Sequence, residues 1–315
     1  MVTSAAQAES TFGRIGVLMG GRSAEREISL QSGNAMLKAL RERGHEVVAV
    51  DVAEDVCARI MAAQMDVALL ALHGRWGEDG CIQGLLEVQG IPYTGSGVRA
   101  SANALDKVST KRLLQAAGLP TPAWAFPATV EGGLALGFPL VLKPRSEGSS
   151  VGLHIVKDEA QLRTLLGGED TASEALLEAY IPGRELTVGV MGSGEAAQVL
   201  GTLEIRAAGG LYDYGAKYEK DDTEYLVPAP LSEPQVLLLT RLALDVHRFL
   251  DCAGVTRVDF RWDRPESGAT EPLVLELNTL PGMTAQSLLP KIAAHGGLSY
   301  GELVEQVVAD GRLKA

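Results

Sequence analysis

Three polar residues near the end of the chain have the side chains to hold a divalent metal ion. Asp259 lies in the apolar segment VTRVDFRW, and Glu276 and Asn278 lie in PLVLELNT. Residues two apart in a β-strand point to the same face, so Glu276 and Asn278 are expected side by side. Magnesium that also bridges phosphate oxygens requires hard oxygen ligands of this kind. Asp259 and Glu276 could instead form structural ion pairs with Arg257 and another base, but the added amide favours a metal site.

A lysine and a loop rich in serine and glycine could hold phosphate. Lys143 ends the apolar segment FPLVLKP, and residues 147–152, EGSSVG, offer backbone amides and two hydroxyls. The order differs from the GxxxxGK[ST] of a P-loop, and a loop of this composition is more often an ordinary turn. Lys107 and Lys217 lie on separate segments, so three lysines could meet one triphosphate, although each alone is typical of a solvated surface lysine.

The segments that must position these residues fall into three expected domains. Residues 1–12 are small and polar without periodicity, which predicts a disordered tail. Residues 13–103 alternate strand-like runs, RIGVLMGG, HEVVAVDV and DVALLAL, with helical segments, which is the pattern of a parallel sheet with crossover helices. We therefore expect a Rossmann-like N-terminal domain.

The rest of the chain predicts two further domains, at residues 104–185 and 186–315, and an α/β (α+β) class overall. The first begins with a helix that ends at Gly118 before two prolines. Its strands FPLVLKP, VGLHIVKD and EALLEAYI, with a helix over 159–166, suit a small mixed sheet. The second contains the strands RELTVGVMG, AAQVLGTLEI, VTRVDFRW and PLVLELNT, with helices over 236–250 and 300–309.

Composition limits the possible functions. The chain has 315 residues, 46% of them hydrophobic, which is enough for a substantial core. A total of 40 acidic against 28 basic residues gives a net charge of −12, which argues against binding of nucleic acid. No apolar run is long enough to span a membrane, and the first residues lack the pattern of a signal peptide, so we expect a cytoplasmic protein. Cys57, Cys81 and Cys252 are widely separated, so we expect buried thiols rather than a disulfide or a zinc site.

Seven segments, in order and with compatible spacing, closely resemble the D-alanine–D-alanine ligase family of the ATP-grasp superfamily. They are GGRSAEREISL, ALHGRWGEDG, DKVSTK, VLKPRSEGSSVG, YDYGAKY, TRVDF and LELNTLPGMTAQSLLP. The resemblance implies a three-domain ATP-grasp enzyme that holds ATP between its central and C-terminal sheets. It also implies a cytoplasmic homodimer that joins two D-alanines, through a D-alanyl phosphate, for peptidoglycan synthesis.

By this resemblance, one group of residues binds ATP. Lys107 and Lys143 correspond to contacts with the phosphates, and Lys217 is assigned to the same ligand. Glu178 takes the position that accepts a hydrogen bond from the adenine amino group, and Glu185 takes the position that binds the ribose. Considered alone, both glutamates are typical of exposed acids in a strand or turn.

The resemblance also assigns the catalytic centre. Asp259, Glu276 and Asn278 correspond to the ligands of two magnesium ions, which manganese can replace. Arg257 and the backbone N–H of Gly282 match the donors that stabilise the tetrahedral oxyanion. Either could instead be structural, since an arginine two residues from Asp259 in a strand often pairs with it and a glycine after proline often marks a turn.

The two D-alanines are assigned to a third group. Glu25 matches the residue that binds the first ammonium, although SAERE by itself predicts a helix start with Ser23 as its cap. Tyr218 stands where related D-lactate ligases usually carry phenylalanine, so it favours a dipeptide product. The remaining positions are Ser149, which joins Glu25 and Tyr218, His73 near the first substrate, and Tyr212, Ser287 and Leu288 as further substrate contacts. The segment LYDYGAKYEKDDTEY suits a lid that excludes water, or an ordinary surface loop.

Some positions depart from the family pattern. Trp76 stands where a smaller residue is common, and Leu280, Ala285 and Gln286 stand where serine, serine and histidine are also seen. These changes are expected at the rim of the second subsite, where they affect affinity rather than the type of reaction.

Two other functions stay open at this point. A relative that uses D-lactate or D-serine as its second substrate is one, and a non-catalytic ATP-binding regulatory module is the other. The catalytic residues Arg257, Asp259, Glu276 and Asn278 argue against the module. The hypothesis of a nicotinamide-dependent enzyme has much weaker support, because GVLMGGRSAE lacks the full GxGxxG spacing.

Overall fold

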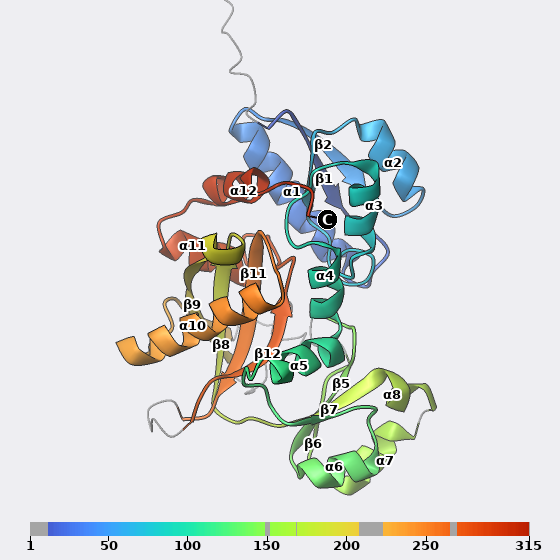
Figure 1. Cartoon of the computed structure of the whole chain (residues 1–315), viewed down its shortest axis with the longest axis vertical. Coiled ribbons are helices and arrows are strands. Elements are labelled where there is room, and N and C mark those ends of the chain that lie inside the picture. The colour runs from blue at the N-terminus through green and yellow to red at the C-terminus, as the bar shows by residue number, and fades with distance from the viewer. Residues whose placement is uncertain (1–11, 149–151, 168, 208–222, 265–269, 315) are drawn as a thin grey trace, which may run out of the picture.

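The computed structural model contains three β-sheets with helices packed around them (Figure 1). It describes residues 12–148, 152–167, 169–207, 223–264 and 270–314. The expected tail at residues 1–12 lies outside the described residues except for its last position. In the part of the chain that is described, no helix is long and apolar enough to cross a membrane.

The first sheet is parallel, as predicted from the alternation of strands and helices. Its strands lie in the order β2-β1-β3, with crossover helices between them. The β-branched and aliphatic side chains of β1 and β3 are fully buried between those helices, which explains their unbroken apolar runs. The elements are β1 (Arg14–Met19), α1 (Arg26–Glu42), β2 (Glu46–Asp51), α2 (Val56–Ala63), β3 (Val67–Leu70), α3 (Cys81–Gln89) and α4 (Val98–Leu105).

The second sheet is antiparallel throughout, so the prediction of a mixed sheet is wrong. Its strands lie in the order β4-β7-β5-β6, and every neighbouring pair is antiparallel. The positions between β5 and β6, 145–153, are too few for the long crossover that a parallel pair needs. The elements are α5 (Lys107–Ala116), β4 (Trp124–Ala125), α6 (Val130–Leu136), β5 (Leu140–Pro144), β6 (His154–Val156), α7 (Glu159–Leu166), α8 (Glu169–Glu174) and β7 (Ala175–Ala179).

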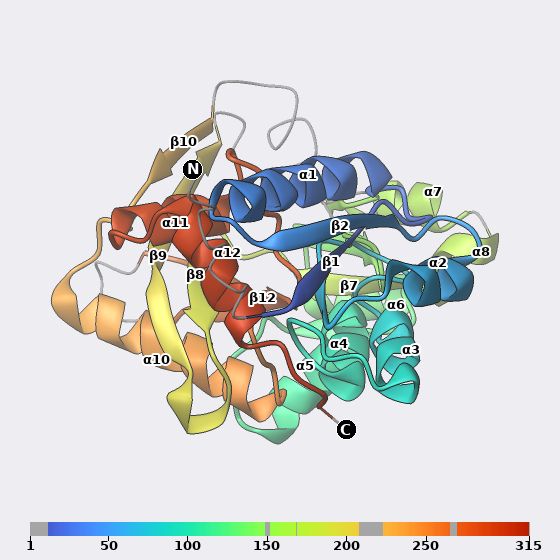
Figure 2. The ribbon, with the colours of Figure 1, turned by 90° about the horizontal axis from the view of Figure 1, so that it is seen from above.

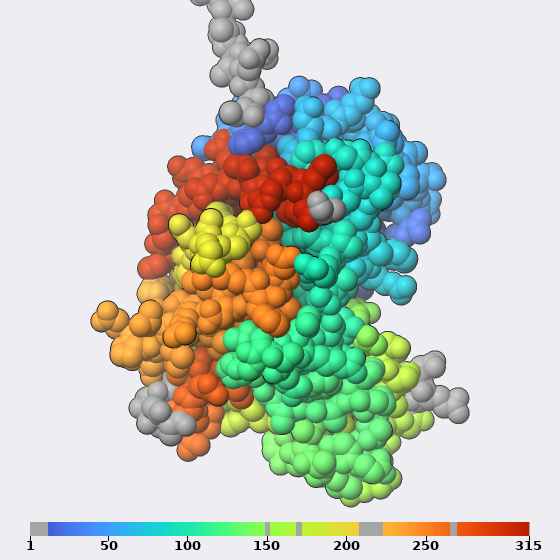
Figure 3. Space-filling model, viewed as in Figure 1, coloured from blue at the N-terminus to red at the C-terminus, as the bar shows by residue number. Residues whose placement is uncertain are grey.

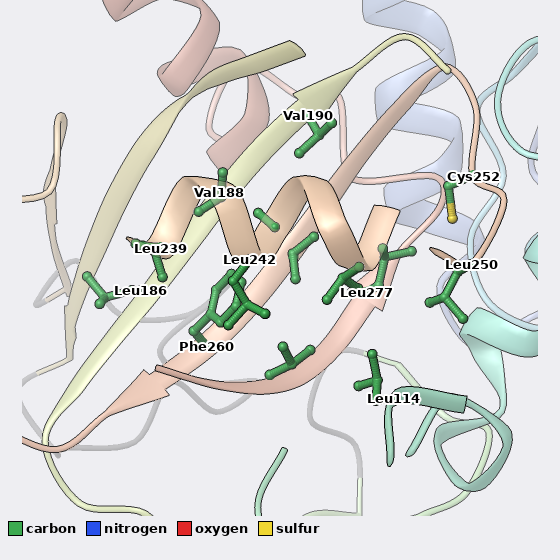
Figure 4. Close-up of a cluster of buried hydrophobic side chains, with 14 of the residues drawn as sticks. Leu114, Leu186, Val188, Val190, Leu239, Leu242, Leu250, Cys252, Phe260 and Leu277 are labelled. Atoms are coloured by element: carbon green, nitrogen blue, oxygen red, sulfur yellow. The ribbon is translucent and has the colours of Figure 1, made fainter. Parts of the chain in front are cut away.

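The third sheet is antiparallel and has the order β10-β9-β8-β11-β12. Leu239 and Leu242 of α10 pack against Leu186, Val188 and Phe260 of the sheet (Figure 4). A capping box of Ser232 and Gln235 begins that helix, which starts before the expected range of 236–250 and ends within it. The elements are β8 (Arg184–Met191), η1 (Gly194–Ala196), β9 (Gln198–Ala207), β10 (Thr223–Leu226), α10 (Glu233–Phe249), β11 (Val255–Trp262), β12 (Leu273–Asn278), α11 (Leu288–His295) and α12 (Tyr300–Ala309).

The C-terminal helices join the third sheet to the first. Leu303 and Val304 of α12 share one buried cluster with Ile15 and Val17 of β1, and Leu289 of α11 belongs to the same cluster. Helix α12 lies against both α1 and α11 (Figure 2). The second sheet and its helices project at the other end of the molecule (Figure 3). The domain boundaries stay a prediction, and α4 spans the first of them.

The expectation that all three cysteines are buried is wrong for two of them. Cys252 is buried, whereas Cys57 and Cys81 are exposed. Both exposed cysteines lie in the first turn of a surface helix, a position that their helical segments alone do not distinguish from a buried one.

Candidate active site

A cleft between the second and third sheets brings together residues that are distant in the sequence. The second sheet and α5 contribute Lys107, Lys143 and Glu178. The third sheet and the start of α11 contribute the remaining predicted residues of the lining, which are Glu185, Arg257, Asp259, Glu276 and Leu288. Basic side chains therefore face acidic ones across a single cleft.

The acidic side of the cleft is built on two neighbouring strands. Asp259 of β11 lies directly opposite Glu276 of β12, and Arg257 lies opposite Asn278. Asp259 accepts hydrogen bonds from Thr187 Oγ1 at 2.6 Å, from Arg257 Nε at 2.8 Å and from Asn278 Nδ2 at 3.0 Å. The structural ion pair between Arg257 and Asp259 considered from the sequence is thus present, and it orients the carboxylate within the cleft.

The oxygen atoms of Asp259, Glu276 and Asn278 suit magnesium. Two carboxylates and an amide oxygen are hard ligands, and Mg²⁺ usually takes only one or two carboxylates and fills its other positions with water and phosphate oxygens. No cluster of three or more histidine, cysteine, aspartate or glutamate side chains placed for a metal occurs in the described residues. The oxygens of Asp259, Glu276 and Asn278 therefore fit magnesium that is shared with a phosphate ligand, rather than a metal held by the protein alone.

The basic side of the cleft is fixed through the start of α5. Asp106 caps this helix by accepting from the backbone N–H of Val108 and Ser109, and its carboxylate pairs with Arg145 after β5. This places Lys107 against the carbonyl oxygen of Glu147 and 3.7 Å from Glu276 Oε2. Burial lowers the pKa of Lys107.

Sequence reasoning missed two partners of the predicted glutamates. Lys111 is fully buried in α5 and its ammonium contacts Glu178, which also lies 3.0 Å from Lys143 Nζ. Arg261 lies 2.8 Å from Glu185. The sequence could have indicated Lys111 through its spacing from Lys107 in DKVSTK, because residues four apart lie on the same face of a helix.

Glu25 lies between two glycine-containing loops from different parts of the chain. A Cβ atom at Gly74 or Gly148 would come within about 3 Å of Glu25 Oε2, so the glycines let both loops approach this carboxylate closely, and the φ of +66° at Gly74 also favours glycine. Ser23 donates to the carbonyl oxygen of His73 at 2.8 Å. Glu25 rather than Ser23 is the N-cap residue of α1, and the expectation of a Ser23 cap is wrong. The predicted partners Ser149 and Tyr218, like Tyr212 and Lys217, lie outside the described residues.

His73 and Glu78 hold the backbone of Leu280 from both sides. The Nδ1 atom of His73 lies 3.1 Å from the Leu280 carbonyl oxygen, and Glu78 Oε1 accepts from the Leu280 N–H at 3.2 Å. Glu78 also accepts from the N–H of Gly74 at 2.8 Å. Burial lowers the pKa of His73 and raises that of Glu78 to about 8. The loop after β3 is thereby joined to the segment that follows β12, and Glu78 was not predicted.

The segment after Leu280 carries Gly282 and Ser287. A Cβ atom at Gly282 would lie 2.9 Å from Ser287 Oγ, so a side chain there would displace the Ser287 hydroxyl. The neighbouring Met283 donates its N–H to Ser32 Oγ at 3.3 Å and accepts from Tyr300 at 2.6 Å. Gly282 is therefore held by groups from α1 and α12.

Trp76 and Leu288 differ in their surroundings. Leu288 is buried at the start of α11 and lines the cleft between the sheets. Trp76 is 48% exposed and lines a separate cavity of about 260 Å³ beside β1 and β3, with Arg75 stacked over its ring. Its departure from the family pattern thus falls beside the first sheet.

Replacing Glu78 by glutamine should change how stability depends on pH. A carboxyl whose pKa is higher in the folded than in the unfolded chain binds more protons when folded, so it costs stability progressively as pH rises from about 4.5 to about 8. The melting temperature of Glu78→Gln relative to the unmutated chain should therefore rise between pH 5 and pH 8.

Glu204→Gln is the matched control in that experiment. Burial tends to raise the pKa of Glu204, but Arg184 and Arg206 hold it below its usual range. The Glu204 carboxylate stabilises the fold at pH values above its pKa in the unfolded chain, and this stabilisation is lost only at lower pH. The difference in melting temperature between Glu204→Gln and the unmutated chain should therefore stay constant from pH 5 to pH 8. If the difference in melting temperature between Glu78→Gln and the unmutated chain also stayed constant over this pH range, the raised pKa of Glu78 would be contradicted.

Two family models match the chain. The model described as D-ala D-ala ligase C-terminus matches residues 113–309, and the model described as D-ala D-ala ligase N-terminus matches residues 14–59 and 56–96.

Curated relatives and solved structures are similar over nearly the whole chain. The chain is 47% identical over 311 residues to a D-alanine–D-alanine ligase of Anaeromyxobacter dehalogenans strain 2CP-1, with 96% of this chain and 98% of the relative covered. It is 47% identical over 302 residues to one of Cereibacter sphaeroides strain ATCC 17025, with 95% and 96% covered. A D-alanine–D-alanine ligase crystal structure from Bacillus anthracis has a TM-score of 0.82 at 37% identity, covering 95% of this chain and 97% of that one. A second, complexed with ATP, has a TM-score of 0.81 at 35% identity with the same coverage.

Proposed function

The chain belongs to the D-alanine–D-alanine ligase family, with the ATP-grasp fold expected from its motifs, and from this premise we propose how its residues work. It is an ATP-dependent ligase that joins two D-alanines to supply a peptidoglycan precursor. The observation that carries the assignment of the site is the cleft in which lysines of α5 and the second sheet face carboxylates of the third sheet.

ATP occupies this cleft in the proposal. Lys107 and Lys143 are buried cations at its edge and contact the phosphates, with Lys217 as a third. Glu178 accepts a hydrogen bond from the adenine amino group, and Glu185, oriented by Arg261, binds the ribose. Each of the two described lysines already lies near one carboxylate of the protein, Glu276 or Glu178, and a triphosphate would add further negative charge beside them.

Asp259, Glu276 and Asn278 would hold two magnesium ions, or manganese in their place, between the protein and the phosphates. Bound there, the metal neutralises charge on the transferred phosphoryl group. Thr187 and Arg257 contribute separately by fixing the Asp259 carboxylate before any ligand binds.

The reaction proceeds in two steps that need charge neutralisation and orientation. A carboxylate oxygen of the first D-alanine attacks the γ-phosphorus of ATP, which forms D-alanyl phosphate and releases ADP. The deprotonated amine of the second D-alanine then attacks the acyl carbon, and phosphate leaves with that carboxylate oxygen. Arg257 and the N–H of Gly282 donate hydrogen bonds to the oxyanion of the tetrahedral intermediate.

The substrates lie between the first domain and the segment after β12. Glu25 binds the ammonium of the first D-alanine, and His73 lies beside that substrate. Ser149 and Tyr218 complete the second subsite with Glu25, while Tyr212, Ser287 and Leu288 make further substrate contacts. This assignment is supported by the position of Glu25 against Gly74 and Gly148, which brings both loops to one place.

The domain boundaries at 103 and 185, the homodimer and the cytoplasmic location are also part of the proposal. They rest on the motifs shared with the family and on the composition of the chain. The protein is acidic overall, and lysines gather locally in the cleft. This arrangement suits a small anionic ligand such as ATP rather than nucleic acid.

The choice of second substrate is tested by product analysis. The purified chain is incubated with ATP, magnesium and D-alanine, with D-lactate or D-serine added as competing acceptor at neutral pH, and products are identified by mass spectrometry. We expect D-alanyl-D-alanine to dominate. Preferential ester formation would assign the chain to a D-lactate ligase, and absence of phosphate release with D-alanine would indicate a non-catalytic ATP-binding module.

A further inference from the structure

Lys111 is a buried cation that does not reach the cleft. It is fully buried in α5, and its ammonium contacts Glu178 Oε2 and donates to Thr121 Oγ1 at 2.8 Å. Lys143 and Glu178 line the cleft, whereas Lys111 is not part of the lining. Glu178 is thus contacted by one lysine at the cleft and by a second lysine behind it.

Thr121 fixes the position of the hidden ammonium. Its hydroxyl donates to the carbonyl oxygen of Val274 at 2.8 Å while it accepts from Lys111. Val274 belongs to β12, the strand that carries Glu276. The lysine, the hydroxyl and the strand form a chain of contacts that leaves Lys111 little freedom to move away from Glu178.

The charge of Glu178 depends on these two lysines. Burial alone would raise the pKa of its carboxyl, but the ammonium groups of Lys111 and Lys143 outweigh burial and hold it below the usual range. Burial in turn lowers the pKa of Lys111 to about 8. Both ammonium groups lie beside Oε2, and their charge and their hydrogen bonding both favour the ionised carboxylate.

We propose that Lys111 is a positioning residue that keeps Glu178 ionised and in one orientation, and thereby makes the nucleotide site select a purine with an amino group. The proposal rests on the assignment of Glu178 to the adenine amino group. An ionised carboxylate only accepts hydrogen bonds, so it binds a 6-amino group and repels a 6-oxo group, whereas a protonated carboxyl can donate to a 6-oxo group.

Lys143 cannot supply this function by itself. It is the lysine that faces the cleft and contacts phosphate in the proposed function, so its charge is shared with ATP. Lys111 lies outside the lining of the cleft, so its charge is not shared with a ligand bound there. Removing Lys111 would leave a buried carboxylate with one shared counter-ion, which favours uptake of a proton.

Nucleotide binding without D-alanine tests the proposal independently of ligase turnover. The affinities of ATP and of inosine 5′-triphosphate, which carries a 6-oxo group in place of the 6-amino group, are measured by titration calorimetry in the presence of magnesium. The unmutated chain should prefer ATP by at least about tenfold, the range expected for a hydrogen bond to a charged group. Lys111→Met should lower this preference by about tenfold, and Lys111→Arg, which keeps the cation, should retain it.

Control variants separate this role from a structural one. Lys157→Met removes an exposed lysine of the same domain and should leave the preference unchanged. In a Glu178→Gln background, where no carboxylate needs a counter-ion, adding Lys111→Met should not lower the preference further. If Lys111→Met alone fails to fold, the comparison of Glu178→Gln with and without Lys111→Met still tests the proposal.

Two results would overturn the proposal. The first is an equal loss of affinity for both nucleotides in Lys111→Met, with the ratio unchanged, because a general structural defect acts on both. The second is a further fall of the ratio in the Glu178→Gln background. A chain that binds ATP selectively but forms no dipeptide would contradict the proposed ligase function and leave the role of Lys111 intact.

Discussion

Replacing Glu276 by glutamine is expected to lower kcat at least about 100-fold and to raise the magnesium concentration needed for half-maximal activity. Mutations of groups that only orient metal ligands typically cost 10–100-fold in metal affinity or activity, so loss of a direct ligand should cost no less. Glutamine keeps the shape of the side chain but removes the charge that lies opposite Asp259 and 3.7 Å from Lys107. Initial rates measured over a range of magnesium concentrations provide the test.

Glu204→Gln is a suitable control for that experiment. Glu204 is a buried glutamate of the same sheet, and its carboxylate pairs with Arg184 at 2.6 Å outside the cleft. Its replacement should lower the melting temperature and leave the magnesium dependence unchanged. If Glu276→Gln kept both kcat and magnesium dependence, the assignment of this face of β12 to the metal would be wrong.

Replacing Arg257 by lysine is expected to lower kcat by about 100- to 1,000-fold with little change in the KM for ATP. Loss of one oxyanion donor has an effect of this size. Lysine keeps the positive charge but loses the planar pair of donors that reaches Asp259 at 2.8 Å and 2.7 Å. Steady-state kinetics with ATP and D-alanine varied separately provide kcat and each KM.

Arg261→Lys is the matched control, because Arg257 and Arg261 lie on the same face of β11 and are similarly buried. Arg261 contacts Glu185, the proposed ribose ligand, so its replacement should mainly raise the KM for ATP. Equal effects of the two substitutions on kcat would indicate that Arg257 acts only by supporting the strand.

Local sequence patterns predicted most of the elements but not the direction in which strands pair. The alternation of strands and helices before residue 103 predicted the parallel sheet, since parallel strands need crossover helices. In the second sheet the same kind of apolar run forms only antiparallel pairs. Apolar periodicity shows that a strand is buried, but direction depends on the loop that follows it.

Site residues that lie in the shared motifs could be predicted from the sequence. Partners that depend on tertiary contacts could not. Lys107, Lys143 and Asp259 were expected from motifs, and the structure places all three in one cleft. Lys111 meets Glu178 across 67 positions of sequence, and Glu78 reaches Leu280 across 202. Neither pair has a local pattern, because each depends on how the sheets pack.

The transfer of an oxygen atom from substrate to phosphate tests the ATP-activated ligation most directly. D-alanine labelled with ¹⁸O in both carboxylate oxygens is converted with unlabelled ATP, and the products are analysed by mass spectrometry. If D-alanyl phosphate forms and is attacked by the second amine, each released phosphate carries one ¹⁸O and the new peptide carbonyl keeps the other. Unlabelled phosphate, or label in AMP instead, would contradict this mechanism.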